Sequence, residues 1–541
     1  MKTEIESYPS DSKETPVEYV DGEAPSNSSD GSRTIISPSK HRLFRIFIVN
    51  KNIGYLNLVS YLIACFGTIC LVAYLSIVQP FVLTVLLGIS ADKGNLTGNL
   101  ALYDEIIALP ATLLWGILSD RIGRRPVYSM GFTCLGAALI LYSTVKNVYP
   151  QMLLCRLLFS VGSAACTCMM TGTLGDIAGG QHERGRVSAI VGMFAGFGGL
   201  VSGMVLIQIP YQLGEKVNNE VEGIQLALTI VGGCAIGLAA IFFFTMPNVN
   251  VPDGAIRRYM KRCVGLSRKE DEDPALKPLK IANPFTMLKY GFLAARDPRI
   301  ALAYISSFVA RADTVLFTSY MSLWVIQHYI DLGWCRGTNS CMAAAGDTHM
   351  LTGMGQGISL AFAPIFGFAS ERFKKSTVLS VAGFIGAIGS LPFAFTKMPP
   401  ADKSNYAFVT MIGIGQIGMI VTGMTLVNGT YMDPKFRGSV AGVFSFCGAI
   451  SIMIMVKLGG YLFDVWMRGA PFVLMGIAHL VVALVSIYVR IVTPRLERHD
   501  AEMFALEAAR KKAGLEEEEG EKENTEVWNN AMLSLTPGFH K

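Results

Sequence analysis

The chain has 541 residues, of which 51% are hydrophobic and only 16% charged, and its mean hydropathy is +0.42. This composition excludes the charged surface of a soluble globular protein and indicates an integral membrane protein. The formal net charge of +5 requires no nucleic-acid partner, because basic residues also orient membrane proteins beside anionic lipid.

The apolar residues cluster in stretches of about 18 to 25, the length of a helix that crosses about 30 Å of hydrocarbon. We predict twelve spans, at residues 59–87, 98–118, 126–145, 150–174, 187–208, 223–245, 300–326, 350–369, 376–395, 406–429, 438–462 and 471–492. Their length excludes a β-barrel, whose strands contain about ten alternating residues. The sequence therefore predicts an all-α membrane protein.

Three polar segments flank or divide the spans. Residues 1–54 begin with a Ser- and Pro-rich stretch and are expected to be a largely disordered cytosolic tail, without a signal-peptide core. Residues 247–299 are rich in Lys and Pro and read as a linker between two domains. Residues 493–541 predict a short amphipathic helix followed by an acidic tail.

Basic residues predict the orientation. With both termini in the cytosol, the inner loops hold 21 Lys and Arg and the outer loops 7. Asn95 in "NLT" is then a possible glycosylation site in the first outer loop, and Cys335 and Cys341 are candidates for a disulfide in the fourth. Lys457, near the outer end of the eleventh span, is expected to extend to the membrane interface.

Two segments repeat. GILSDRIGRRPV (116–127) aligns with GFASERFKKSTV (367–378) at an offset of about 251, and ERGRVSAIVG (183–192) aligns with FRGSVAGVF (436–444) at an offset of about 253. Residues 55–246 and 300–492 are therefore predicted to be two six-span bundles related in parallel.

The first repeat carries a resemblance to a known family. It matches the signature G-x-L-x-D-R-x-G-R-[KR] of the major facilitator superfamily at Gly116, Leu118, Asp120, Arg121, Gly123, Arg124 and Arg125. The chain resembles this family over roughly residues 55–492, and in general impression it is nearest to fungal exporters of drugs or organic anions. The resemblance implies two pseudo-symmetric bundles, with spans one, four, seven and ten lining the substrate path.

An acidic residue inside each basic repeat predicts a conformational gate. The N-terminus of the eleventh span has unpaired N–H groups and a partial charge of about +0.5, so the Asp120 carboxylate is expected to bind there. Glu371, beside Gly367 and Arg372, is its equivalent and is expected at the start of the fifth span near Gly185. The alternative is that these charges serve only as topology signals.

Five charged residues inside the predicted spans are candidates for substrate or proton binding: Arg156, Asp104, Glu105, Arg311 and Asp313. Arg311 is expected to face the cavity as an anion contact. Asp313 lies about 200° around the same helix and should meet another helix or carry a proton. Arg156 resembles the family's fourth-span Arg associated with proton coupling, with Asp104 or Glu105 as its partner. Structural interhelical pairing is the alternative.

The fifth span contains Gly192, Gly196, Gly199 and Gly203 at a spacing of three or four, which favours close helix packing. The family's antiporter motif has a Gly-Pro pair in this span, but here Phe197 follows Gly196. Antiport is therefore not favoured, and symport and uniport remain open.

We expect a secondary-active transporter that moves a small organic solute by alternating access, with protons as the coupling ion and a monomer sufficient for function. A solute sensor with the same fold and a facilitative uniporter are the alternatives. The chain has no zinc-protease, serine-hydrolase or Walker motif, so we predict neither an enzyme nor a bound cofactor or metal. The plasma membrane is the expected location, with the vacuolar membrane second.

Overall fold

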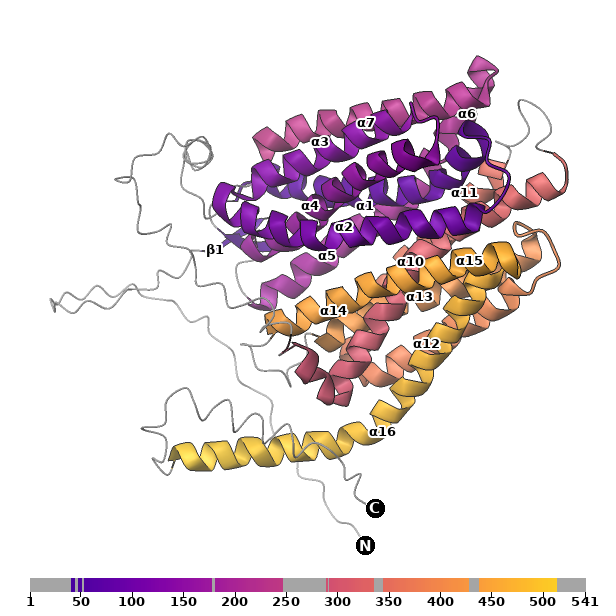
Figure 1. The fold of residues 1–541 in the computed structure, drawn as a ribbon. Coiled ribbons are helices and arrows are strands. Elements are labelled where there is room, and N and C mark those ends of the chain that lie inside the picture. The colour runs from indigo at the N-terminus through magenta and orange to yellow at the C-terminus, as the bar shows by residue number, and fades with distance from the viewer. Residues whose placement is uncertain are drawn as a thin grey trace, which may run out of the picture. The chain divides into compact units, whose positions relative to one another are not determined.

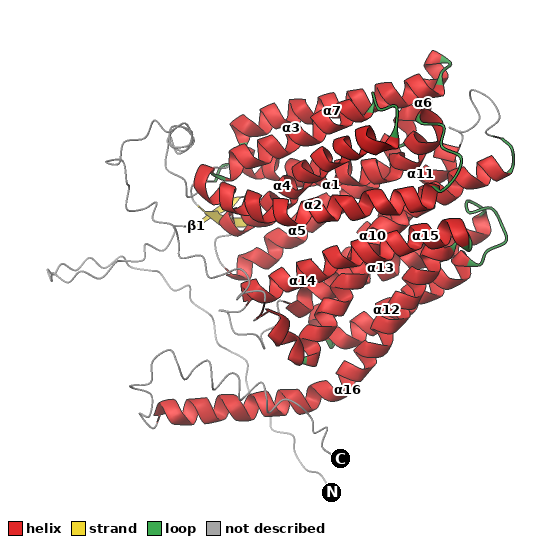
Figure 2. Cartoon of the chain, in the orientation of Figure 1, coloured by secondary structure: helices red, strands yellow, loops and turns green. Residues whose placement is uncertain are grey.

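The computed structural model describes residues 40–43, 47–50, 53–177, 181–246, 289, 291–334, 344–427 and 437–512. The chain divides into two units, Met1–Ser39 and Lys40–Lys541, and all described residues belong to the second. In this unit the described residues are almost entirely helical (Figure 2).

The first half of the fold is a group of antiparallel helices. Its elements are α1 (Tyr55–Phe81), α2 (Lys93–Ile122), α3 (Arg124–Tyr142), α4 (Leu153–Ile177), α5 (Gln181–Val201), α6 (Gln208–Val217) and α7 (Glu220–Thr245). α3 packs between α4 and α7, α2 packs on α4, and α1 packs on α5. We call this group the N-bundle, drawn indigo to magenta in Figure 1.

The second half repeats the arrangement and is called the C-bundle. Its elements are α10 (Pro298–Asp331), α11 (Ala344–Arg372), α12 (Lys375–Ala394), α13 (Tyr406–Val427), α14 (Arg437–Ser451), α15 (Lys457–Val465) and α16 (Ala470–Lys512). α12 packs against α13 and α16, and α11 packs against α13. Short 3₁₀ turns at Ala294–Arg296 and Lys403–Asn405 precede α10 and α13.

Because successive helices alternate in direction, the fold has two ends. We call the end that holds the starts of α1 and α10 the terminal face. The opposite end, which holds the start of α2 and the end of α15, is the distal face.

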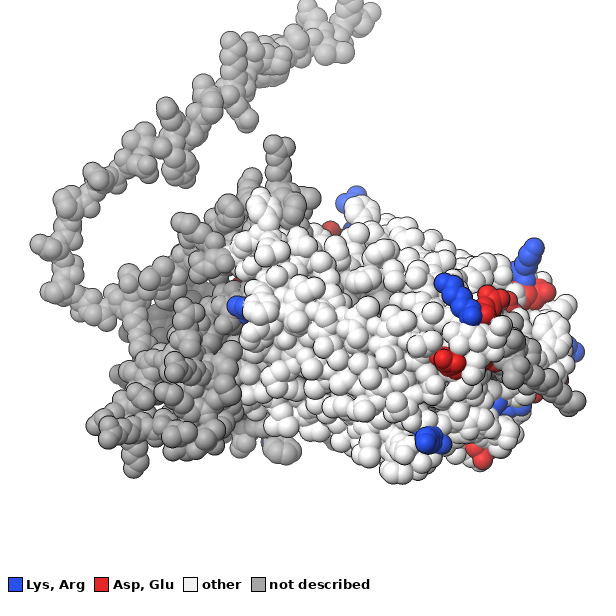
Figure 3. Space-filling view, turned by 90° about the horizontal axis from the view of Figure 1, so that it is seen from above, with Lys and Arg blue, Asp and Glu red and all other residues white. Residues whose placement is uncertain are grey.

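The predicted spans correspond to helices of the structure. Within the described ranges, eleven helices are long and apolar enough to cross a membrane. The predicted span 126–145 corresponds to a further helix, α3, whose 19 residues extend about 28 Å. Viewed over the α3 and α7 side, the middle of the molecule is almost free of charge, and charged side chains gather at one end (Figure 3). The chain is therefore a multi-pass membrane protein.

Turns of π-helix interrupt several spans. One turn, Ser202–Leu206, lies between α5 and α6, and another, Ile452–Val456, lies between α14 and α15. They occupy equivalent places in the two halves. Two more occur at Val82–Leu86, after α1, and at Val148–Met152, before α4. Such turns interrupt the regular hydrogen-bond ladder and are frequent at functional sites.

Some helix limits differ from the prediction. α2 begins at Lys93, five residues early, and the fifth span continues through α6 to Val217. α16 is one helix through Pro494 rather than a span and a separate amphipathic helix, and Figure 1 shows it bending as it leaves the bundle. In the tail predicted to be largely disordered, β1 (Lys40–Leu43) pairs antiparallel with β2 (Phe47–Asn50). Hydropathy identifies the apolar part of a helix but not its polar ends.

Candidate functional site

The N-terminus of α10 is defined by a first-turn proline and a capping carboxylate. Pro298 occupies the first turn, and the Asp297 carboxylate accepts a hydrogen bond of 2.8 Å from the N–H of Arg299. From there the helix packs against α1, α11, α13, α14 and α16. α10 therefore packs on helices of both bundles.

Arg311 and Thr314 are exposed on this helix. Since helices of both bundles pack on α10, we infer that their exposed surface faces an opening between the bundles rather than lipid. Arg311 packs beside Gly448 of α14, where a side chain would collide with it. Gln416 of α13 donates a 3.1 Å hydrogen bond to the Thr314 hydroxyl. The structure thus places a guanidinium and neutral polar groups at this opening.

A second polar cluster lies in the N-bundle. The side chain of Arg156 on α4 is 7% exposed, and its Nε donates a 2.8 Å hydrogen bond to Asp104 of α2. Arg156 also donates to the carboxamide oxygen of Gln79 on α1. The other Asp104 oxygen and the Gln79 nitrogen are buried without a hydrogen-bond partner. Asp104 and Gln79 therefore each keep an unused polar atom.

Glu105 lies between the two polar clusters. It is half-buried on α2, and the charged groups that act on it are Arg311 and Asp104. α2 also contacts α10 directly. Glu105 and Arg311 are therefore opposite charges presented by the two bundles to each other, and Asp104, rather than Glu105, is the carboxylate that binds Arg156.

Asp313 points away from this opening, into the C-bundle. Its carboxylate Oδ2 lies 2.7 Å from Nε2 of His479 on α16, and the two side chains are 1% and 0% exposed. The approach lies off the direction of a hydrogen bond, so both carboxylate oxygens and both ring nitrogens lack a hydrogen-bond partner. Sequence reasoning missed His479, although a His in the middle of an apolar span is itself a signal.

The bundles are joined at the distal face. Asp464, at the end of α15, accepts hydrogen bonds from the backbone N–H groups of Gly94 at 3.1 Å and Asn95 at 2.7 Å. Lys457 donates to the side-chain oxygens of Asn95 and Asn99. These contacts give the first turn of α2 a carboxylate from the other bundle, which satisfies N–H groups that a helix start leaves unpaired.

One prediction about this face needs correction. Asn95 lies within the first turn of α2 rather than in an outer loop, and its side chain is engaged by Lys457. The ammonium group of Lys457 reaches Asn95 and Asn99 of α2 in the other bundle. Cys335 and Cys341 lie outside the described residues.

The predicted gate motif is described only in part. The side chains of Asp120 and Arg121 lie outside the described set. Arg124 binds Asp176 at the end of α4 at 3.1 Å, and Arg125 donates to the carbonyl of Phe243 on α7 and lies over its ring. These two arginines therefore tie α3 to its neighbours in the N-bundle. Asp176, a lone carboxylate beside a glycine-rich loop, was missed.

On the terminal face the described contacts between bundles are sparse. Gly116 has only Cys168, of its own bundle, near the position of a Cβ, and Gly367 has no atom there within 4 Å. Glu371 and Arg372 are exposed. Their expected partners near Gly185 lie outside the described side chains.

The glycines of α5 show where the bundles touch. Gly196, Gly199 and Gly203 face Leu360, Gln356 and Thr352 of α11, whereas Gly192, nearer the terminal face, faces open space. Three of the four predicted packing glycines therefore lie at the interface. The tightest approach to α1 is made by Gly198, outside the predicted stripe, at the carbonyl of Phe66. Among the described residues, the bundles thus meet in the distal half of α5 and in the π-turn that follows it.

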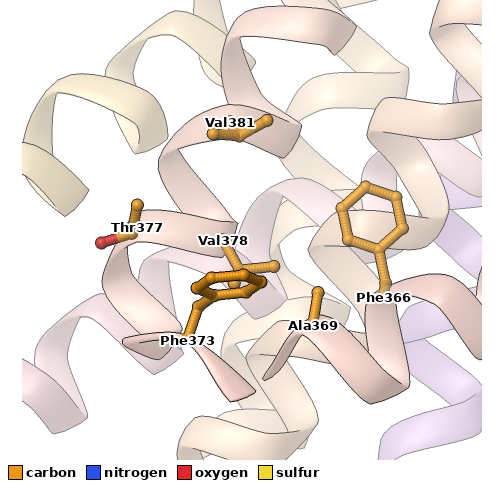
Figure 4. Close-up of a pocket in the computed structure, with 6 residues that line it drawn as sticks. All are labelled: Phe366, Ala369, Phe373, Thr377, Val378 and Val381. Carbon is orange, nitrogen blue, oxygen red and sulfur yellow. The ribbon is translucent and has the colours of Figure 1, made fainter. Parts of the chain in front are cut away.

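An apolar pocket lies elsewhere, between the end of α11 and the start of α12. It is lined by Phe366, Ala369, Phe373, Thr377, Val378 and Val381 (Figure 4). No charged side chain lines it, so it has no group to balance the charge of an ionic solute. The polar opening beside Arg311 is therefore the better candidate site.

Two pseudo-symmetric helical bundles around a polar opening define a membrane protein of the transporter type. The family model of the Major Facilitator Superfamily matches residues 58–456 and 303–532, and the chain belongs to this superfamily.

Curated relatives are distant. MamZ of Paramagnetospirillum magneticum, a magnetosome protein, is 26% identical over 443 residues, covering 79% of this chain and 61% of MamZ. The chain thus spans about three fifths of that relative's length. MamH of the same organism is 26% identical over 75% of this chain and 86% of MamH. Citrate exporter 1 of Aspergillus niger is 36% identical over 110 residues, 20% of each chain.

Solved structures share the fold. The nucleoside transporter NupG superposes with a TM-score of 0.57 at 14% identity, over 81% of this chain and 99% of NupG. A peptide transporter, POT, superposes with a TM-score of 0.53 at 16% identity, over 83% of this chain and 97% of POT. These likenesses concern the fold alone.

Proposed function

We propose that this protein is a proton-coupled secondary-active transporter that moves a small organic anion by alternating access. The observation that carries the proposal is the exposed guanidinium of Arg311 on a helix enclosed by other helices. A cation held in a water-filled opening at membrane depth binds carboxylate or phosphate groups strongly.

The choice of Arg311 over Arg156 rests on their partners. Arg156 is bound by Asp104 and Gln79, whereas no described side chain forms an ion pair with Arg311 within 4.0 Å. Arg311 is therefore available to a solute. The unused Asp104 oxygen and Gln79 nitrogen are buried in the N-bundle, and they would supply an acceptor and a donor for the solute's polar groups once helix movement exposes them.

The chemical class of the solute receives separate support. The segment similar to a citrate exporter covers only 20% of the chain, but a carboxylate solute agrees with the charge of Arg311. We propose a di- or tricarboxylate. On the basis of the basic inner loops, we further propose that both termini are cytosolic and that the plasma membrane is the location.

Counterflow in proteoliposomes tests the proposal without a coupling gradient. Vesicles loaded with unlabelled citrate should take up labelled citrate, and Arg311→Ala should reduce the rate by more than about tenfold, as expected for loss of a charged hydrogen bond. Arg468→Ala, which removes an exposed arginine on the distal face, is the matched control and should leave the rate unchanged.

Three results would decide the role of Arg311, the chemical class of the solute and whether the protein is a transporter. Equal rates for Arg311→Ala and the wild type would refute the assignment of Arg311. A neutral nucleoside exchanged as fast as a panel of carboxylates would refute the anionic class. Saturable citrate binding without exchange would indicate a sensor rather than a transporter.

A further inference from the structure

The Asp313–His479 pair lies apart from the opening beside Arg311. Asp313 is on the opposite side of α10, two residues beyond Arg311 and so about 200° around the helix. His479 comes from α16, which packs along α10. Both side chains are almost completely buried, with Nε2 and Oδ2 2.7 Å apart.

The surroundings of the pair are apolar and tight. Gly386 of α12 lies directly beneath the imidazole ring, where a side chain would overlap Nδ1, and Gly383 approaches the carbonyl of His479. Gln416 of α13 is turned to Thr314. Within the described helices that pack on the pair, no further charged group acts on Asp313 or His479.

Charge balance then fixes how many protons the buried pair can hold. With one proton its net charge is zero, and the apolar surroundings favour the neutral acid beside a neutral imidazole over a carboxylate beside an imidazolium. With no proton its net charge is −1, and with two protons it is +1. Burying a net charge without a partner is costly, so the occluded pair must hold one proton.

We propose that Asp313 and His479 together form a one-proton binding site, which loads or releases its proton only when helix movement admits water and which thereby couples conformation to protonation. This inference rests on the proposed function and assigns its coupling site. Because α10 carries Arg311 on one side and Asp313 on the other, one helix movement alters both the solute site and the proton site.

The two members of the pair have unequal roles. In Asp313→Asn the amide and a neutral His479 have no net charge without any proton, so conformational change should no longer depend on pH. In His479→Gln the lone carboxyl still needs a proton to be buried. That variant should therefore keep a pH dependence, with its midpoint moved to higher pH. A merely structural pair would lose stability in both variants without this asymmetry.

Infrared spectroscopy of the full-length protein in lipid nanodiscs tests the site without a solute. The wild type is titrated between about pH 5 and 9, and the C=O band of a protonated carboxyl is assigned to Asp313 by its loss in Asp313→Asn. We expect this band to fall as pH rises in the wild type and to persist to higher pH in His479→Gln. Ser370→Ala, which breaks a buried hydroxyl pair with Thr422 in the same bundle, should titrate like the wild type.

An Asp313 band that stays constant over this range, or a pH response of citrate counterflow that is identical in wild type and Asp313→Asn, would overturn the inference. If Asp313→Asn does not fold, His479→Gln and Gly386→Ala provide the same test, because a methyl group at residue 386 displaces the imidazole. A titrating band without any solute flux would reject the proposed function and leave the proton site. Proton-driven flux without a titrating band would support the proposed function and reject the proton site.

Discussion

The carboxylate of Asp464 in the C-bundle lies 2.7 Å from the backbone N–H of Asn95 in the N-bundle. This contact places an acidic side chain at the N-terminus of α2. The sequence predicts the reverse arrangement on the terminal face, where Asp120 at the end of α2 would meet the start of α14. If the predicted contact also forms, α2 and the eleventh span, which comprises α14 and α15, would exchange carboxylates at opposite ends, and we expect the two contacts to form alternately.

The distal contact should hold the distal face closed. Asp464→Asn keeps the shape but removes the charge, and helix caps contribute about 0.5–2 kcal/mol. We expect the distally open population to rise about tenfold, since 1.4 kcal/mol is a factor of ten. Electron–electron resonance between spin labels at Tyr149 and Met398, in a background without native cysteines, measures this population.

Asp402→Asn is the control for that change. Asp402 is acidic and lies on the distal face, but its described partner, the backbone N–H of Ser404, belongs to its own bundle. Its substitution should leave the distance distribution unchanged. Equal shifts in both variants would mean that the total negative charge of the distal face, rather than the cap of α2, keeps this face closed.

Asp120 provides the test on the terminal face. Asp120→Asn should shift the population in the opposite direction, toward opening of the terminal face, and should lower the counterflow rate at a normal membrane level. The same resonance experiment, with labels moved to the terminal face, measures the shift. Unchanged turnover in Asp120→Asn would mean that the repeated segment at residues 116–127 only orients the protein in the membrane.

Close backbone approach is a second requirement for distal closure. A Cβ at Gly460 would overlap the carbonyl oxygen of Gly94, whereas Gly442 faces open space. Overpacking costs about 1–3 kcal/mol, so Gly460→Ala should slow citrate counterflow by about tenfold or more. Gly442→Ala should have no effect, and loss of activity in both variants would instead indicate a general sensitivity to helix glycines.

Hydropathy predicted the spans because each apolar stretch is decided locally, by length and composition. The partners of the buried charges cannot be predicted from local sequence in this way. His479 and Asp313 are 166 positions apart, and Asp464 and Asn95 are 369 apart, so only the packing of helices brings them together. The start of α2 at Lys93 was also missed, because its polar first turn is stabilised by the other bundle rather than by lipid.

Removing one partner of the Arg156–Asp104 pair should destabilise the protein. Asp104→Asn leaves the buried guanidinium without its carboxylate, and breaking a buried pair costs about 3–5 kcal/mol. We expect a clear decrease in the thermal unfolding midpoint in detergent. The double variant Asp104→Asn/Arg156→Gln should recover part of it, and additive losses in the double variant would contradict an energetic pair.

Accumulation of labelled citrate in proteoliposomes under an imposed pH gradient tests most directly that the protein is a proton-coupled anion transporter. We predict concentrative uptake that reverses when the gradient is reversed, that collapses with a protonophore and that is lost in Arg311→Ala. Uptake that only equilibrates citrate, at a rate independent of the gradient, would contradict proton coupling and establish a uniporter.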